Sequence, residues 1–134
     1  MNEALTPRQT LQRRAIRTVL QEAEGPLTPQ EILQRAGREL ASLGLATVYR
    51  NLNSMQSAGE VHAVHLPGEP ARFERVPEKH QHHFRCDSCE TVYALDEPCP
   101  VQSLQGATLP GGFRVADHSL TFYGTCPDCA SAHA

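Results

Sequence analysis

Apolar side chains recur at helical spacing in the first half of the chain, which predicts a series of helices. The first helix is predicted between about residues 8 and 22, ahead of a break at Gly25 and Pro26. A second helix is predicted after Thr28, which can cap its first turn and form a capping box with Glu31. The apolar positions of the first helix are Leu11, Ala15, Ile16, Val19 and Leu20.

A third helix is predicted to begin near Leu45, and the period changes after Gly59. Its buried stripe is expected to contain Val48, Leu52 and Met55. Beyond Gly59, short apolar segments flank a turn at residues 67–70, which is typical of a β-hairpin. Three helices and a hairpin make a winged helix-turn-helix, whose third helix enters the major groove of DNA. The same elements also fit a small helical subdomain with a solvated polar face.

The composition is that of a globular protein, with 40% hydrophobic and 20% charged residues in a chain of 134. No apolar run approaches the ~18 residues that a membrane helix needs. The first residues show no basic segment followed by an apolar stretch, so no secretory signal is predicted. We therefore expect a cytoplasmic protein without a membrane partner.

Charge is distributed unevenly along the chain, although the net value of −3 by itself argues against nucleic acid. Residues 1–76 hold nine arginines and eight acidic residues, whereas residues 77–134 hold three basic and seven acidic residues. Four arginines near the start form a local basic patch, in which Arg8 and Arg13 can contact the backbone or the minor groove of DNA. The four arginines are Arg8, Arg13, Arg14 and Arg17.

Cysteine and histidine are concentrated in residues 77–134, which hold all five cysteines and five of the seven histidines. Without a secretory signal, such a cluster is better explained by metal ligands than by disulfides. Two Cys-x-x-Cys pairs stand 36 residues apart and together predict a closed tetrahedral site for a structural zinc ion. The four predicted ligands are Cys86, Cys89, Cys126 and Cys129. The alternative is that these cysteines are simply reduced or disulfide-bonded.

An enzyme is not expected, and neither is a small-molecule substrate. A zinc hydrolase needs three protein ligands, an open position for water and a nearby base. The chain has no His-Glu-x-x-His segment, and its four-cysteine site is closed. A zinc-ribbon interaction module without DNA binding is a further alternative, but the basic patch and the third helix argue against it.

Three segments together resemble the ferric uptake regulator family, namely residues 44–52, 80–89 and 118–129. The first is similar to the family's recognition helix, and the others are similar to its metal-binding segments. The resemblance implies an α+β fold: a winged helix-turn-helix DNA-binding domain at 1–76 and a small α/β dimerisation domain, stapled by zinc, at 77–134. It implies a homodimeric repressor that binds a palindromic operator when loaded with metal. The candidate DNA contacts are Thr47, Tyr49, Arg50, Arg8 and Arg13.

One regulatory site of the family draws its ligands from the hinge and from both domains, and this site is incomplete in the present sequence. The matching positions are Pro26, Glu74, Gln81 and His83. Pro26 cannot bind a metal, and Gln81 is a poor ligand. His62 or His65, on the predicted hairpin, would supply a nitrogen, although each also fits a solvated residue.

A second family site, within residues 77–134, is matched by His80, His82 and His118. The carboxylate that the family expects aligns near Val101, and a small shift would bring in Glu97 or Cys99 instead. The alternative for Cys99 is a small buried apolar residue without a role.

The available ligand types indicate which metal is sensed. Imidazole with thiolate favours zinc over iron(II) or manganese(II), and the stretch around Cys99 is similar to the zinc uptake regulator branch of the family. We therefore expect zinc as the regulatory ion, with iron, manganese or peroxide sensing as alternatives. Peroxide sensing is disfavoured because the aspartate expected by that branch is matched by Glu74.

Overall fold

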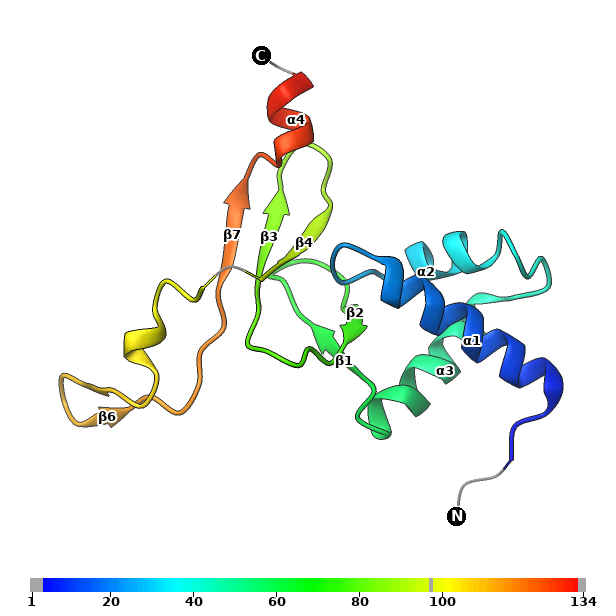
Figure 1. Cartoon of the computed structure of the whole chain (residues 1–134), viewed down its shortest axis with the longest axis horizontal. Helices are drawn as coiled ribbons and strands as arrows, with labels where there is room; N and C mark the ends of the chain where they lie inside the picture. The colour runs from blue at the N-terminus through cyan, green and yellow to red at the C-terminus, as the bar shows by residue number, and fades with distance from the viewer. Residues whose placement is uncertain (1–3, 97, 133–134) are drawn as a thin grey trace. The chain divides into compact units, whose positions relative to one another are not determined.

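The computed structural model describes residues 4–96 and 98–132, and the chain divides into two compact units, residues 1–76 and 77–134 (Figure 1). The first unit contains three helices and a hairpin, and the second contains seven further elements, most of them short strands. None of the described helices combines the length and the apolar character that crossing a bilayer requires.

Helix α1 (Pro7–Glu22) and helix α2 (Pro29–Ala36) both begin with a capping box. At α2 the Thr28 hydroxyl accepts from the Glu31 amide at 3.2 Å, and the Glu31 carboxylate accepts from the Thr28 amide at 3.1 Å. The predicted start of α2 is therefore confirmed. The prediction for Leu11 is wrong, because 52% of this residue is exposed. The buried stripe of α1 runs through Gln12 and Ile16, and Leu11 lies outside it.

Helix α3 (Leu45–Ser57) buries Val48, Leu52 and Met55 completely, as predicted. These side chains pack with those of α1 and α2 in one apolar core. The hairpin follows as β1 (Val61–Val64) and β2 (Arg72–Arg75), which pair antiparallel. This hairpin, the wing, is also joined to the segment between α1 and α2, because Phe73 and Leu27 exchange backbone hydrogen bonds of 2.7 and 2.9 Å. This unit is a winged helix-turn-helix.

The second unit contains a three-stranded sheet in the order β4-β3-β7 (Figure 1). Strand β3 (His82–Cys86) pairs antiparallel with β4 (Val92–Leu95) and parallel with β7 (Thr121–Gly124). The connection from β4 to β7 holds a 3-10 turn (Gln102–Leu104) and a small hairpin of β5 (Thr108–Leu109) and β6 (Phe113–Arg114). Helix α4 (Pro127–Ala132) follows β7.

The second unit has a very small apolar core. Among its described residues, the apolar side chains classed as buried are those of Cys86, Val92 and Cys126. A domain that buries so little apolar surface needs another source of stability, such as a bound metal. Two of these three buried apolar residues, Cys86 and Cys126, belong to the predicted zinc site.

Candidate metal centres

The two Cys-x-x-Cys pairs lie at the same end of the sheet because β3 and β7 are parallel. Their register aligns Cys86 with Gly124, so Cys126 follows β7 close to the end of β3. The four sulfur atoms all lie within 4.8 Å of one another, and those of Cys89 and Cys126 are 3.9 Å apart. A tetrahedral zinc ion with Zn–S bonds of about 2.3 Å needs sulfurs about 3.8 Å apart. The cluster therefore fits zinc.

Backbone amides of the two turns hold the thiols in position. The Cys126 amide donates a hydrogen bond to the Cys86 sulfur at 3.3 Å. Hydrogen bonds of this kind from backbone amides lower the pKa of Cys86 to about 6. Hydrogen bonding to Cys126 and burial instead raise the pKa of Cys129 to about 12. The thiols of Cys86 and Cys129 therefore differ in how readily they ionise, and four thiolates this close together would repel one another. A bound dication would supply the compensating positive charge.

A second cluster brings together three histidines and the fifth cysteine. The Nε2 atom of His80 lies 3.1 Å from that of His82 and 3.0 Å from that of His118. The Cys99 sulfur lies 3.0 Å from Nε2 of His82 and 3.1 Å from Nε2 of His118. Four potential ligand atoms therefore surround one point. Tetrahedral zinc needs nitrogens about 3.3–3.4 Å apart, a small expansion from these distances.

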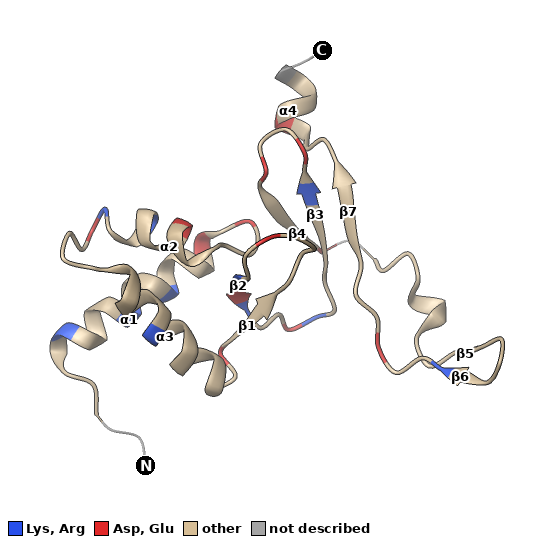
Figure 2. Cartoon of the chain, turned by 180° about the vertical axis from the view of Figure 1, so that it is seen from behind, with Lys and Arg blue, Asp and Glu red and all other residues tan. Residues whose placement is uncertain are grey.

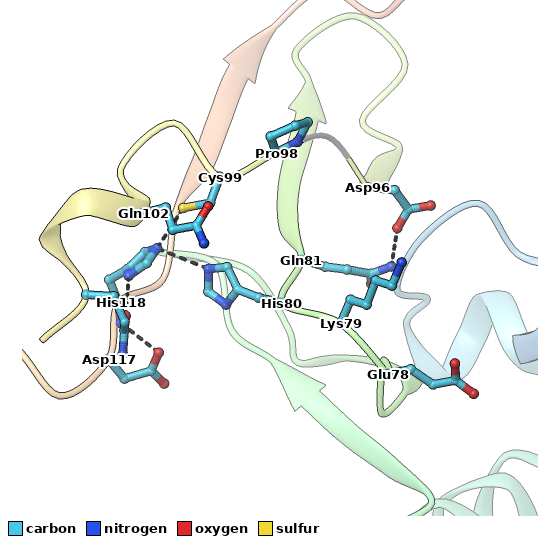
Figure 3. A pocket seen from close by; sticks show the side chains of 11 residues that line it. Glu78, Lys79, His80, Gln81, Asp96, Pro98, Cys99, Gln102, Asp117 and His118 are labelled. Atoms are coloured by element: carbon cyan, nitrogen blue, oxygen red, sulfur yellow. Dashed lines mark hydrogen bonds between the residues drawn. The ribbon is translucent and has the colours of Figure 1, made fainter.

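The histidine cluster borders a hollow of about 850 Å³. In Figure 3 the side chains of His80, Cys99 and His118 point toward one another, away from the bonded pair Gln81 and Asp96. His82 is buried, and this burial, followed by the nearby histidines, lowers its pKa. His82 is therefore neutral near pH 7, which is the form that binds metal.

The predicted regulatory ligands lie in different places in the structure. Cys99 joins the three histidines, whereas Glu97 lies outside the described residues. Glu74 is buried on β2, where its carboxylate lies 2.8 Å from Nε2 of His62. His65 is exposed after β1, and His83 is half-buried on β3. Among the described residues, Glu74, His65 and His83 belong to neither cluster of four ligands.

The predicted DNA contacts lie on α1 and α3, both of which carry arginine (Figure 2). Tyr49 and Arg50 are exposed, and Arg50 Nη2 donates to the Thr47 hydroxyl at 2.9 Å. Arg8 is exposed on α1. Arg13 is half-buried, and its Nε atom donates to the Asn51 side chain on α3.

Residues 5–123 match the model of the ferric uptake regulator family. The chain belongs to this family. It is 36% identical to a zinc uptake regulation protein of Mycobacterium tuberculosis over 125 residues, which are 92% of this chain and 95% of the relative. It also resembles the structure of a zinc-bound manganese uptake regulator, with 29% identity, a TM-score of 0.75 and coverage of 92% and 91% of the two chains. An iron-containing ferric uptake regulator from Francisella tularensis is similar at 25% identity, with a TM-score of 0.73 and coverage of 97% and 96%.

Members of the ferric uptake regulator family are metal-binding transcriptional regulators rather than enzymes, and dimers are typical of them. The present regulator therefore combines a winged helix-turn-helix with two residue clusters able to hold metal.

Two further residues of this protein were not singled out from the sequence. Asn51 is buried on α3, where its oxygen accepts from Arg13 Nε at 3.0 Å and its nitrogen donates to the Thr47 carbonyl at 2.9 Å. A polar residue beside the buried stripe of a helix is a signal that could have identified it. Gln105 Oε1 lies 2.9 Å from Nδ1 of His118. No local pattern marks Gln105, because its partner lies thirteen positions further along the chain.

Proposed function

We propose that this protein is a zinc-responsive repressor of metal-uptake genes, which binds a palindromic operator as a homodimer. The observation that supports zinc most directly is the composition of the second cluster, three imidazole nitrogens and one thiol around one point. Iron(II) and manganese(II) favour oxygen ligands and higher coordination, whereas imidazole with thiolate suits tetrahedral zinc. The regulatory ligands are His80, His82, Cys99 and His118.

The two clusters have different roles in this proposal. The four-cysteine cluster holds a permanent structural zinc ion, because four thiolates close the coordination sphere and the surrounding unit has little other core. The histidine cluster binds the exchangeable ion, since it borders an open hollow and carries only one thiolate. We expect one structural and one regulatory zinc ion per subunit.

Regulation follows from linkage between metal and DNA. If the zinc-loaded dimer holds its two α3 helices at the spacing of successive major grooves, zinc and DNA each favour the same arrangement. Each ligand must then tighten the binding of the other by the same factor. Tyr49 contacts base edges, while Arg50, Arg8 and Arg13 contact phosphates, with Thr47 orienting Arg50.

The sensed metal is tested by following DNA binding in metal-buffered solutions. A palindromic duplex selected from a random pool by the zinc-loaded protein serves as the probe. We expect zinc to activate binding at lower free concentrations than iron(II) or manganese(II). Activation by iron(II) or manganese(II) but not by zinc would overturn the proposal and favour the alternative sensors of the same family.

Variants separate the regulatory ligands from other histidines and cysteines. Cys99→Ser should shift the zinc dependence of DNA binding to higher free zinc by at least tenfold, because a hydroxyl is a much poorer zinc ligand. His65→Ala is the matched control, since His65 is an exposed histidine outside both clusters. An unchanged zinc dependence in Cys99→Ser would remove Cys99 from the site.

The DNA-contacting face is tested without changing metal content. Replacing Tyr49 and Arg50 by alanine should weaken operator binding sharply, while two zinc ions per subunit are retained. Gln56→Ala, an exposed change in the last turns of α3, is the control and should bind DNA normally. Unchanged operator affinity in the Tyr49 and Arg50 variant would mean that this helix does not contact DNA. It would favour the alternative of an interaction module without DNA binding.

A further inference from the structure

The Gln105 side chain lies between the histidine cluster and the β5–β6 hairpin and is bonded at both ends. Its amide nitrogen donates to the Ala116 carbonyl, and its amide oxygen lies 2.9 Å from Nδ1 of His118. Two backbone hydrogen bonds close the same segment. The Gly106 amide donates to the Val115 carbonyl at 3.1 Å, and the Val115 amide donates to the Ala107 carbonyl at 2.8 Å. Gln105 is therefore held in one orientation by the hairpin that follows it.

This arrangement determines which nitrogen of His118 carries the proton. A backbone carbonyl only accepts hydrogen bonds, so the amide nitrogen of Gln105 must face Ala116 and the oxygen must face His118. The His118 Nδ1 atom then donates, which leaves the lone pair on Nε2. That lone pair points to the point shared with His80 and Cys99, whose ligand atoms lie 3.0 and 3.1 Å away.

His82 provides a contrast within the same cluster. Its Nδ1 atom is buried and has no hydrogen-bond partner in the part of the chain that the structure describes. His82 is positioned by strand β3 and by burial, whereas His118 lies outside the strands and depends on its side-chain contacts. An imidazole ligand whose second nitrogen donates to a fixed oxygen binds metal more tightly, because its orientation and tautomer are already set.

We infer that Gln105 is a positioning residue of the regulatory site, which holds His118 in its metal-binding tautomer and thereby sets the zinc affinity of the site. The inference rests on the proposed role of this cluster, but it concerns metal binding itself and not DNA binding. Gln105 does not touch the ion; it acts through His118.

The first measurement needs no metal in the regulatory site. Long-range nitrogen–proton NMR spectra of full-length protein, with the four-cysteine site loaded with zinc, report the tautomer of His118. We expect a protonated Nδ1 in the wild type and a mixture of tautomers in Gln105→Ala. A wild-type His118 protonated on Nε2 would overturn the inference.

The second measurement is zinc affinity, obtained by competition with a chelator in the absence of DNA. Loss of such a supporting bond typically weakens metal binding by about 10–100-fold, and we expect this range for Gln105→Ala. Gln105→Glu keeps an acceptor for Nδ1 but loses the donor to the Ala116 carbonyl, so it should weaken zinc binding less than Gln105→Ala. Gln102→Ala is the matched control: Gln102 is another glutamine that lines the same hollow, three positions earlier.

The outcomes are distinguishable from those of the proposed function. Equal zinc affinity in the wild type and Gln105→Ala, or an equal loss in Gln102→Ala and Gln105→Ala, would overturn the role of Gln105. Retention of the four-cysteine zinc ion in every variant shows that the fold is intact. If Gln105→Ala weakens zinc binding but zinc does not activate DNA binding in the wild type, the inference holds and the proposed function fails.

Discussion

Replacing Asn51 by alanine tests how the first helix is joined to the predicted DNA-reading helix. Asn51 is 8% exposed, accepts from Arg13 Nε at 3.0 Å and donates to the Thr47 carbonyl at 2.9 Å. The bond from Arg13 joins α1 to α3 through two side chains. Its loss should therefore affect both stability and the position of the guanidinium.

The expected magnitude follows from the surroundings of the two groups. A hydrogen bond to a charged group contributes about 1.5–3 kcal/mol when water does not replace it. Arg13 is half-buried, so water can reach part of its guanidinium in the variant. The Thr47 carbonyl lies within a helix and keeps its backbone partner. We expect Asn51→Ala to lower the free energy of unfolding of the first unit by about 1–2 kcal/mol.

A double-mutant cycle isolates the bond itself. Arg13→Ala, Asn51→Ala and the double variant are unfolded in urea and followed by far-ultraviolet circular dichroism, since the three longest helices all belong to the first unit. The coupling energy between the two positions should be about 1 kcal/mol. Asn51→Asp keeps the acceptor and should retain most of this coupling, while the exposed Asn53→Ala should leave stability unchanged.

The same variants have a consequence for DNA binding if Arg13 contacts a phosphate as proposed. Asn51→Ala should weaken operator binding about three- to tenfold, because a guanidinium that is not held in place loses more freedom on binding. Arg13→Lys keeps the charge but lacks Nε, so it should resemble Asn51→Ala rather than the wild type. A coupling energy near zero, together with unchanged operator affinity in Asn51→Ala, would refute this reasoning.

Three further predictions concern the stability of the two units. The hydrogen bond to Arg17 lowers the pKa of Glu60, so this pair stabilises the fold above the ordinary carboxyl pKa of 4.5 and is lost as the pH falls through the lower folded value. In urea titrations at pH 7, Glu60→Gln should lower the free energy of unfolding by less than about 1 kcal/mol, because both side chains are partly exposed. This difference from the wild type should disappear in acid. A difference that persists in strong acid would contradict the pairing. Leu52→Ala, at a fully buried position, should lower the free energy of unfolding by about 2–5 kcal/mol, and a smaller loss would mean that α3 repacks. Cys126→Ser should release zinc and make residues 77–134 sensitive to protease while the first unit keeps its helical signal; a protease-resistant second unit would show that its fold does not need the metal.

Local signals in the sequence determined much of the first unit. The period of the apolar residues and the capping box at Thr28 and Glu31 predicted the three helices, because these features depend on residues three or four positions apart. The buried stripe of α3 was predicted for the same reason. Leu11 was misplaced because its apolar character was counted without knowing which face of α1 the other helices would cover.

The two Cys-x-x-Cys pairs were also evident from the sequence, but their meeting was not. Only the parallel register of β3 and β7 brings the pairs to the same end of one sheet. The path of the chain after β4 likewise decided that Cys99, rather than a residue at Val101, completes the histidine cluster. The orientation of His118 by Gln105 depends on the hairpin between them. Spacing reveals which ligands a short segment offers, whereas strand register and loop path decide which distant segments share an ion.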